Sequence, residues 1–253
     1  MSKILLEETK KDLRRLRLND MADGISEAIE KAGQNKLGYL EFIASLVKKQ
    51  VKAVNARSLD RRIKKACFPE WLTFESFDWN FQPGLNVEYV KDLAGLSFIA
   101  DRKPVLILGK TGTGKTHIAT AFGIKACEYG YRVAFYTAQD LLRRLDKTLS
   151  HDTTFELISY LVRLDLLIID ALGFIRPKRE YASLLFDLVN ACRNRVTLIV
   201  TSNISFEEWG QIMGNPSITN AIVDRLIDRS CIINIREGIS YRTHGPNAPK
   251  NSK

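Results

Sequence analysis

Long apolar runs, paired cysteines and histidines are scarce in this sequence. No apolar run approaches the roughly 20 residues that a helix needs to cross a bilayer. The start, Met1–Glu8, soon turns acidic, so a secretory signal is not expected and a cytoplasmic location is. Cys67, Cys127, Cys192 and Cys231 form no CxxC pair, and the three histidines add no metal-ligand pattern. These absences argue against a membrane-spanning protein, a disulfide framework and a zinc module, and predict reduced, mostly buried thiols.

Positive charge is in excess. The 253 residues include 38 Lys and Arg against 29 Asp and Glu, giving a net charge of +9. The 45% hydrophobic and 26% charged content is typical of a globular protein with one large core and a smaller accessory region. A basic balance favours a polyanionic partner, either nucleic acid or an anionic membrane surface, although a soluble protein can be basic without one.

The first 70 residues are predicted to form a small all-α N-terminal domain. Apolar residues recur there at helical spacing, with possible breaks at Asp23-Gly24 and at residues 32–35. A second periodic stretch begins at Tyr39 and continues into a basic run opposed only by Asp60. The run comprises Lys48, Lys49, Lys52, Arg57, Arg61, Arg62, Lys64 and Lys65. We expect this domain, residues 1–70, to contact DNA, a partner protein or a neighbouring subunit.

The composition changes near residue 70. Residues 71–85 are rich in aromatics and are flanked or interrupted by Pro69 and Pro83, so they are expected to form a linker. From residue 86, apolar strands at 104–108, 133–136, 166–169 and 196–200 alternate with helices at 116–129, 138–149 and 182–192. Continuous apolar strands separated by helices indicate an α/β fold with a parallel sheet flanked by helices, here over residues 86–243. The polar tail, 244–253, is expected to be disordered.

A phosphate-binding motif follows the first of these strands. The pattern G-x-x-x-x-G-K-S/T is matched at every fixed position by Gly109, Lys110, Thr111, Gly112, Thr113, Gly114, Lys115 and Thr116. Its glycines let backbone N–H groups surround phosphate oxygens at a helix N-terminus. Lys115 would reach the β- and γ-phosphates, and the Thr116 hydroxyl would ligate Mg²⁺. The motif predicts a P-loop that binds ATP; the alternative is a glycine turn without a ligand.

Asp170 ends the third strand, where a P-loop protein places the acid that holds Mg²⁺ through its water shell. The alternative is an ordinary strand-end turn residue. The arrangement resembles AAA+ ATPases, which usually carry a second acid directly afterwards to orient the attacking water. Here that position is Ala171, which can neither accept a proton nor position water, so turnover is expected to be slow or absent unless another group substitutes. Asn203, after the fourth strand, resembles the AAA+ sensor 1 residue, with a turn asparagine as the alternative.

The order of these motifs resembles one family over nearly the whole chain, from about Leu13 to Arg242. It is similar to IstB, the ATP-dependent helper of insertion-sequence transposition, and more distantly to the helicase loader DnaC and the initiator DnaA. The marks are Leu16-Arg17-Leu18, Met21, Lys64-Lys65-Ala66, Gly112 to Ala119 (which includes His117), Leu167 to Asp170, Asp224-Arg225-Leu226 and Ser240-Tyr241-Arg242. Only the P-loop is specific by itself; together, their order and spacing make the resemblance strong.

The resemblance implies further site residues. Arg225 would be an arginine finger that reaches a neighbour's γ-phosphate, because a planar cation pairs bidentately with phosphate oxygens. Arg229, one helical turn later, is the alternative finger, and ion pairs of Arg225 with Asp224 or Asp228 are a purely structural alternative. Arg242 would be the sensor 2 arginine, and His117 would lie beside the nucleotide. The family forms ATP-dependent ring-like or helical oligomers around DNA, so a homo-oligomer is implied.

Two basic segments are candidates for DNA contact. The resemblance implies a helical insertion at residues 139–164, in which Arg143, Arg144 and Lys147 would face DNA, or would form an ordinary solvated helix face. The basic run from Lys48 to Lys65 is the other candidate. Without a recognition-helix pattern, little base reading is expected.

Two functions are compatible with these features. The first is a transposition regulator that assembles with ATP on double-stranded DNA, deforms it and presents it to a cognate transposase. The second is a DnaC-like helicase loader that meets single-stranded DNA. Single-strand binding favours exposed aromatic side chains, and Phe155 and Tyr160 are instead expected on an apolar helix face. A metabolic kinase is disfavoured by Asn203, Arg225 and the lack of an acceptor site.

Overall fold

The computed structural model describes residues 2–175, 178–235 and 237–246. The chain divides into two compact units, Met1–Arg61 and Arg62–Lys253. Composition predicted a boundary near residue 70, whereas this division falls within helix α3 (Tyr39–Ala66). The helices of the described part of the chain are all too short or too polar to cross a membrane.

The first unit is helical, as its periodicity predicted. It contains α1 (Ser2–Arg15), α2 (Asn19–Asn35) and most of α3. Helix α3 is held to α2 by the Met21 N–H, which donates to Gln50 Oε1 over 3.1 Å, and by an Arg57–Asp20 ion pair of 2.6 Å. Among the described residues of this unit the buried apolar side chains are few, namely Ala22, Ile25 and Leu46. Its core is therefore small for an independent domain.

The break predicted at Asp23-Gly24 is wrong, because both residues lie inside α2. The chain turns instead after α1, where Arg17 has a φ of 61°. Gly24 is buried, and a Cβ there would lie 2.8 Å from Lys49 Nζ. The glycine thus marks a close approach between α2 and the Lys49 side chain of α3 and does not end the helix.

The second unit is built on a five-stranded parallel sheet in the order β2-β3-β4-β1-β5. Its strands are β1 (Val105–Gly109), β2 (Val133–Thr137), β3 (Leu166–Asp170), β4 (Thr197–Ser202) and β5 (Cys231–Ile235). The first four were predicted, and the parallel sheet is confirmed. β5 was missed; it is an edge strand with alternating burial, next to β1.

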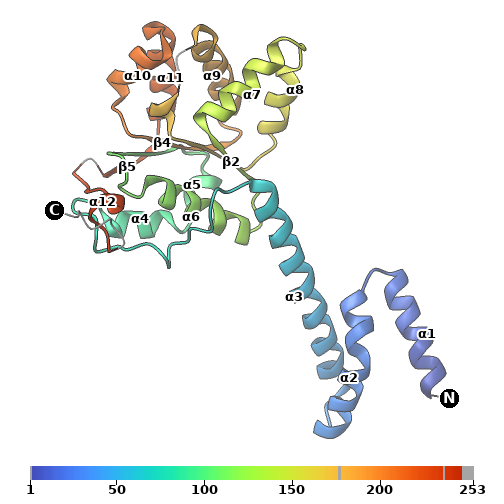
Figure 1. The fold of residues 1–253 in the computed structure, drawn as a ribbon. Helices are drawn as coiled ribbons and strands as arrows, with labels where there is room; N and C mark the ends of the chain where they lie inside the picture. The colour runs from blue at the N-terminus through green and yellow to red at the C-terminus, as the bar shows by residue number, and fades with distance from the viewer. Residues whose placement is uncertain (1, 176–177, 236, 247–253) are drawn as a thin grey trace. The chain divides into compact units, whose positions relative to one another are not determined.

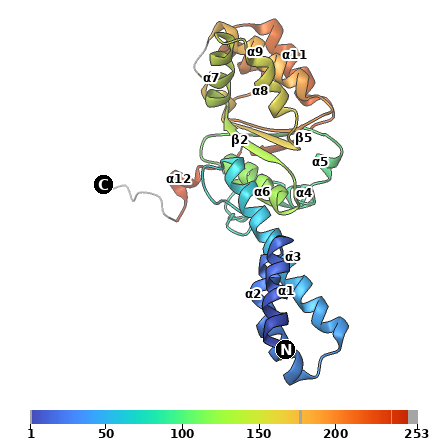
Figure 2. The same ribbon diagram turned by 90° about the vertical axis from the view of Figure 1, so that its right-hand side faces the viewer.

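Helices cover both faces of this sheet (Figures 1 and 2). One face carries α4 (Val87–Leu93), α5 (Ser97–Ala100) and α6 (Lys115–Glu128). The other carries α7 (Ala138–Leu149), α8 (Thr154–Leu161), α9 (Arg179–Cys192), α10 (Phe206–Met213) and α11 (Pro216–Ile227). β1, β3 and β4 are buried along their whole length because both faces are covered.

The segment at residues 71–85, predicted as a linker, is part of the second unit and packs on α6. The Phe74 ring contacts Phe122 of α6 edge-on, with 5.0 Å between centroids, and stacks on Trp79. A short helix, α12 (Tyr241–His244), follows β5, and Gly245 after it is buried. The tail predicted to be disordered, residues 244–253, begins at the last residue of α12, and residues 247–253 lie outside the described part of the chain.

The four cysteines are free thiols. Cys127 and Cys192 are buried, and burial raises the pKa of each thiol to about 12. Cys231 is half-buried, whereas Cys67 is exposed. Within the described residues no group of three or more His, Cys, Asp or Glu side chains could hold a metal ion. Burial was expected for most of the thiols, and it holds for Cys127 and Cys192 but not for Cys67.

Candidate nucleotide site

The predicted P-loop joins the carboxyl end of β1 to the first turn of α6. Gly112 and Gly114 adopt φ values of 81° and 92°, which side chains with a Cβ rarely adopt. The space around them is also filled: an added Cβ would lie 2.2 Å from Ser240 Oγ at Gly112 and 2.8 Å from the Phe77 ring at Gly114. The loop conformation therefore depends on glycine at both positions.

Gly112→Ala is expected to destabilise the protein and to weaken phosphate binding. The loss of stability should exceed the cost of left-handed backbone strain, because the new Cβ would also collide with Ser240. Gly130→Ala is the matched control, because Gly130 has a φ of 94° but open space around its Cα. The strain shared by both variants is about 1–2 kcal/mol. Urea unfolding should show a larger drop in stability for Gly112→Ala, and equal drops would contradict the Ser240 contact.

Lys115 opens α6 and is almost completely buried, with 8% of its surface exposed. Its Nζ donates to the Lys110 carbonyl over 2.7 Å, which keeps the ammonium inside the loop. Burial lowers the pKa of Lys115 from 10.5 to about 8; Asp170 opposes this shift, and Arg242 adds to it. A buried cation with one carbonyl partner is a strong site for an anion, since a phosphate would restore the charged form.

Lys115 should also leave a signature in the pH dependence of stability. Between about pH 8 and 10.5 the folded lysine is neutral while the unfolded one is protonated, so the unfolded state binds more protons. This group therefore makes the free energy of unfolding rise with pH across that window. Urea unfolding of the wild type and of Lys115→Met should show the wild type gaining stability relative to the variant above about pH 8. A constant difference would contradict the lowered pKa.

Asp170 lies at the carboxyl end of β3, with 6% of its surface exposed, and two threonine hydroxyls donate to it. The Thr116 hydroxyl lies 3.0 Å from both carboxylate oxygens, and the Thr201 hydroxyl lies 2.6 Å from Oδ1. The two oxygen-bearing side chains suit a hard cation such as Mg²⁺. The Thr116 hydroxyl would bind the ion directly, and the adjacent Asp170 carboxylate would hold it through its water shell.

Ala171 occupies an unusual backbone conformation directly after Asp170. Its φ and ψ are 61° and 43°, in the left-handed region, and its N–H donates to Thr201 Oγ1 over 2.9 Å. The 3₁₀ turn η1 (Leu172–Phe174) follows. Asn203 lies against this turn, because a Cβ on Gly173 would be 2.1 Å from Asn203 Oδ1. That oxygen is buried without a partner among the described residues.

A pocket of about 600 Å³ opens beside the P-loop. Several predicted residues line it together: Gly112, Gly114, Lys115, Thr116, His117, Asp170 and Arg242. Gly109 ends β1, and Lys110, Thr111 and Thr113 belong to the β1–α6 connection. Asn203 and Arg225 do not line this pocket. The His117 ring, by its Nε2, contacts the Thr73 carbonyl at 2.8 Å and so holds the segment at 71–85 against α6.

Sequence reasoning missed the apolar wall of this pocket, which lies directly beside the P-loop. Apolar and aromatic side chains of residues 69–82 and 241 form it, including Leu72, Phe77, Phe81 and Tyr241. The Phe81 and Tyr241 rings meet edge-on at 4.7 Å, and Gln82 Nε2 donates to the Ile239 carbonyl over 2.9 Å. The aromatic richness of this segment was the available signal, because an apolar slot beside a phosphate loop suits a planar base.

The two finger candidates differ in their surroundings. Arg225 Nη1 donates to the Ala221 carbonyl over 2.9 Å, and its guanidinium lies 4.5 Å from the centre of the Phe186 ring. Asp228, an expected alternative partner, instead pairs with Arg193 at 2.9 Å. Arg229 is exposed in the turn between α11 and β5, with a φ of 58°. Arg225 is thus held within its own chain, while Arg229 is available at the surface.

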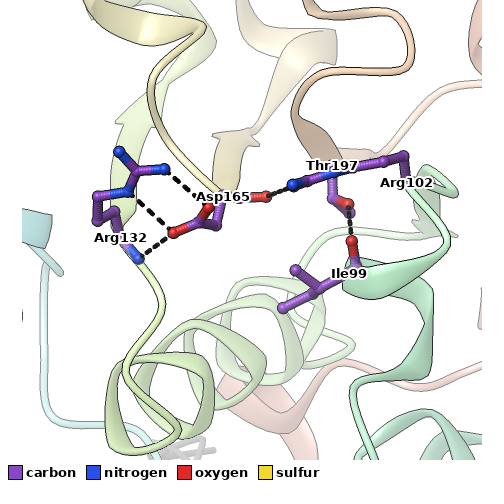
Figure 3. Close-up of polar contacts among 5 residues, drawn as sticks. All are labelled: Ile99, Arg102, Arg132, Asp165 and Thr197. Atoms are coloured by element: carbon purple, nitrogen blue, oxygen red, sulfur yellow. Dashed lines mark hydrogen bonds and ion pairs between the residues drawn. The ribbon is translucent and has the colours of Figure 1, made fainter.

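Both arginines lie at the amino edge of the sheet, opposite the P-loop. The same edge carries the contacts in Figure 3, where Arg132 pairs with Asp165 just before β3 and Arg102 approaches the Asp165 carbonyl. A strand of five residues spans about 16 Å. An amino-edge cation is therefore separated from its own chain's P-loop by the length of the sheet.

The predicted basic surfaces are partly paired. On α7, Leu141, Leu142 and Leu145 are buried, whereas Arg143, Arg144 and Lys147 are exposed. Arg144 lies over the Tyr136 ring at 5.2 Å, and Arg143 is 3.6 Å from Asp140. On α3, Lys49 and Arg57 pair with Glu27 and Asp20 of α2, and Arg62 Nε donates to the Cys127 carbonyl. Lys48, Lys52, Arg61, Lys64 and Lys65 are exposed.

One expectation about the helical insertion is wrong. Phe155 and Tyr160 of α8 were expected on an apolar helix face, but 82% and 50% of their surfaces are exposed. Helix α8 packs on the core through the buried Leu161 and the partly buried Leu157 and Ile158, so Phe155 and Tyr160 lie outside its packed face.

Comparison with known proteins agrees with this architecture. The family model for IstB-like ATP binding proteins matches residues 11–247. The chain is 35% identical over 230 residues to the ATP-binding protein of insertion sequence IS21 from Pseudomonas aeruginosa, covering 91% of this chain and 86% of that protein. It is 34% identical to the corresponding protein of insertion sequence IS5376 from Geobacillus stearothermophilus, covering 90% of each.

Solved structures share the fold at low sequence identity. AMPPCP-bound DnaA from Aquifex aeolicus superposes with a TM-score of 0.57 and 23% identity, covering 70% of this chain and 53% of that one. The DnaC helicase loader gives 0.51 and 18%, covering 58% and 86%. The second unit therefore has the AAA+ fold of DnaA and DnaC. With its family model matched over most of its length, the chain belongs to the IstB-like family of insertion-sequence ATP-binding proteins.

Proposed function

We propose that this chain is an ATP-dependent DNA-binding regulator of transposition. It assembles on duplex DNA, deforms that DNA and presents it to a cognate transposase. The observation that carries the proposal is a pocket that brings together P-loop residues, the Thr116–Asp170 pair and an aromatic wall, in a chain of the IstB-like family. That pocket supports ATP as the ligand, with Mg²⁺ beside Thr116 and Asp170.

The residues of the pocket divide the work. Lys115 and the P-loop N–H groups hold the phosphates, and the slot around Phe77, Phe81 and Tyr241 takes the base. The Thr116 hydroxyl and Asp170 hold the metal ion, which would neutralise charge on the phosphate oxygens. Arg242 adds a second cation to the same pocket. Because Ala171 provides no general base, the ATP-bound state is long-lived, and hydrolysis, which would release the assembly, is slow.

Assembly follows from the position of the finger candidates. A cation at the amino edge of the sheet cannot reach nucleotide bound at the carboxyl edge of the same sheet. It would instead contact the nucleotide bound to the P-loop of a neighbouring subunit. We assign this role to Arg229, because Arg225 is already engaged by Ala221 and Phe186. Such head-to-tail contacts generate rings or helical filaments. The first unit supports assembly as well, since apolar residues lie exposed along α3: Leu40, Ile43, Val47, Val51 and Val54.

The α7 cations are the preferred DNA-binding surface. Changing Arg143, Arg144 and Lys147 together to alanine should weaken duplex binding and flatten its salt dependence. The slope of log K against log salt should fall by about one for each phosphate that the variant no longer neutralises. Filter binding over a salt series measures this. The comparison variant carries alanine at Lys48, Lys52, Arg61 and Lys65 of α3. If only this variant flattens the slope of log K against log salt, DNA binds to α3 and not to α7.

Light scattering tests the proposed function as a whole. Labelled duplex and single-stranded DNA are each mixed with the protein in ATP, in ADP and without nucleotide. Large assemblies on duplex DNA in ATP alone are expected. Assemblies confined to single strands, or absent in every condition, would contradict the proposal.

The second candidate is a loader of a replicative helicase. The exposed Phe155 and Tyr160 on α8 favour it, because bases of a single strand stack on such side chains. Phe155→Ala should then weaken single-strand binding and leave duplex binding unchanged. The duplex proposal stays ahead because the curated relatives belong to insertion sequences.

A further inference from the structure

Thr201 connects the metal side of the pocket to the backbone that follows Asp170. It lies near the end of β4, next to β3 in the sheet, and only 1% of its surface is exposed. Its hydroxyl makes two hydrogen bonds in opposite senses: the O–H donates to Asp170 Oδ1 over 2.6 Å, and Oγ1 accepts from the Ala171 N–H over 2.9 Å. A buried hydroxyl with both capacities used holds its partners in fixed positions.

The two partners of the Thr201 hydroxyl, Asp170 and Ala171, lie next to the proposed Mg²⁺ position. Asp170 faces the Thr116 hydroxyl at 3.0 Å, and rotation of the carboxylate would break that alignment. Ala171 sits at a φ of 61°, which costs an alanine about 1 kcal/mol or more, and the hydrogen bond from its N–H offsets that cost. One hydroxyl therefore fixes both the acid and the turn after it.

We infer that Thr201 is a positioning residue for Mg²⁺: it orients the Asp170 carboxylate toward Thr116 without touching metal or nucleotide itself. This inference rests on the proposed function. Outer partners that orient metal ligands typically account for 10–100-fold in metal affinity. The hydroxyl is the active feature, since a valine would fill the same space and could neither donate to Asp170 nor accept from Ala171.

The test compares nucleotide affinity with and without the metal ion. A fluorescent, non-hydrolysable ATP analogue is titrated into each full-length variant in saturating Mg²⁺ and in EDTA, and the ratio of the two affinities is the Mg²⁺ enhancement. Thr201→Val should lower this enhancement about 10–100-fold and leave affinity in EDTA unchanged. Thr201→Ser, which keeps the hydroxyl, should retain the wild-type enhancement. If the valine variant loses EDTA binding, Thr201→Ala takes its place.

Thr197→Val is the matched control. Thr197 begins the same strand, is fully buried, and its hydroxyl contacts the Ile99 carbonyl at the amino edge, as Figure 3 shows. Thr197→Val should keep the wild-type Mg²⁺ enhancement, because the hydroxyl that it removes lies at the end of β4 away from Asp170. In an Asp170→Asn background, Thr201→Val should have no further effect, since the inferred route passes through that carboxylate.

The outcomes distinguish a failure of the Thr201 inference from a failure of the proposed ATP-dependent function. A wild-type protein that binds the analogue in neither buffer overturns the proposed function. Three results would overturn the role of Thr201 and leave the proposed function standing. The Mg²⁺ enhancement could stay at the wild-type level in Thr201→Val, fall as far in Thr201→Ser as in Thr201→Val, or fall as far in the Thr197→Val control.

Discussion

Ala171→Asp is expected to raise the rate of ATP hydrolysis by about 10²–10⁴-fold, the usual contribution of a positioned general base. The site is ready for this residue. Ala171 has left-handed backbone angles, and aspartate and asparagine tolerate that region better than most residues with a Cβ. Its N–H is already held by Thr201, and its side chain is half-exposed directly after the acid that faces Thr116. The carboxylate can therefore be added without rebuilding the turn.

Ala171→Asn is the control for this prediction. Asparagine has the same shape and the same tolerance of a φ near 61°, but it cannot accept a proton. Phosphate release should rise for the aspartate variant and stay at the wild-type level for the asparagine variant. Equal rates in the two variants would show that the missing acid is not what limits turnover.

The second large effect is expected at Arg229. In the Ala171→Asp background, Arg229→Ala should lower turnover about 10³-fold or more, because a cation supplied by a neighbour stabilises charge on the transferred phosphoryl group. Analogue binding by the isolated subunit should not change. Arg225→Ala should act differently: it removes a guanidinium over Phe186 and a bond to Ala221, so its main effect is on stability.

A mixing experiment makes the Arg229 prediction sharper. Lys115→Ala subunits lack a working P-loop but keep Arg229. Arg229→Ala subunits keep the P-loop but lack the arginine. Each should be inactive alone. If the finger acts across a head-to-tail interface, random mixing restores roughly a quarter of the interfaces. No recovery on mixing, with both variants folded and present in the same assemblies, would place Arg229 outside a composite site.

The sequence predicted this fold where its signals were local. The P-loop is a contiguous motif, and the strands ending at Gly109 and Asp170 are continuous apolar runs, so both were found with their helices. β5 was missed because it buries alternate residues and its sequence, Cys231–Ile235, includes the exposed polar Asn234.

The remaining features depend on tertiary contacts. Residues 71–85 look like a linker in the sequence, and only the fold places Leu72, Phe77 and Phe81 of this segment beside the P-loop. Likewise, helical spacing alone could not show that Phe155 lies on the exposed side of α8, or that Asp20 and Glu27 pair with part of the α3 basic run. Thr201 carries no motif, and its role follows from the register of β4 beside β3.

The hydrogen bonds around the P-loop have a consequence for any attempt to isolate the ATPase. The Tyr241 N–H donates to the Gly112 carbonyl over 2.9 Å, and Gln82 Nε2 binds the Ile239 carbonyl. The pocket is thus closed by two segments from opposite ends of the second unit. A fragment cut at residue 86, or ending before residue 240, would keep every P-loop residue and lose a wall of the site. Nucleotide binding is therefore linked to completion of the whole unit, and ATP should protect its two ends from proteolysis together.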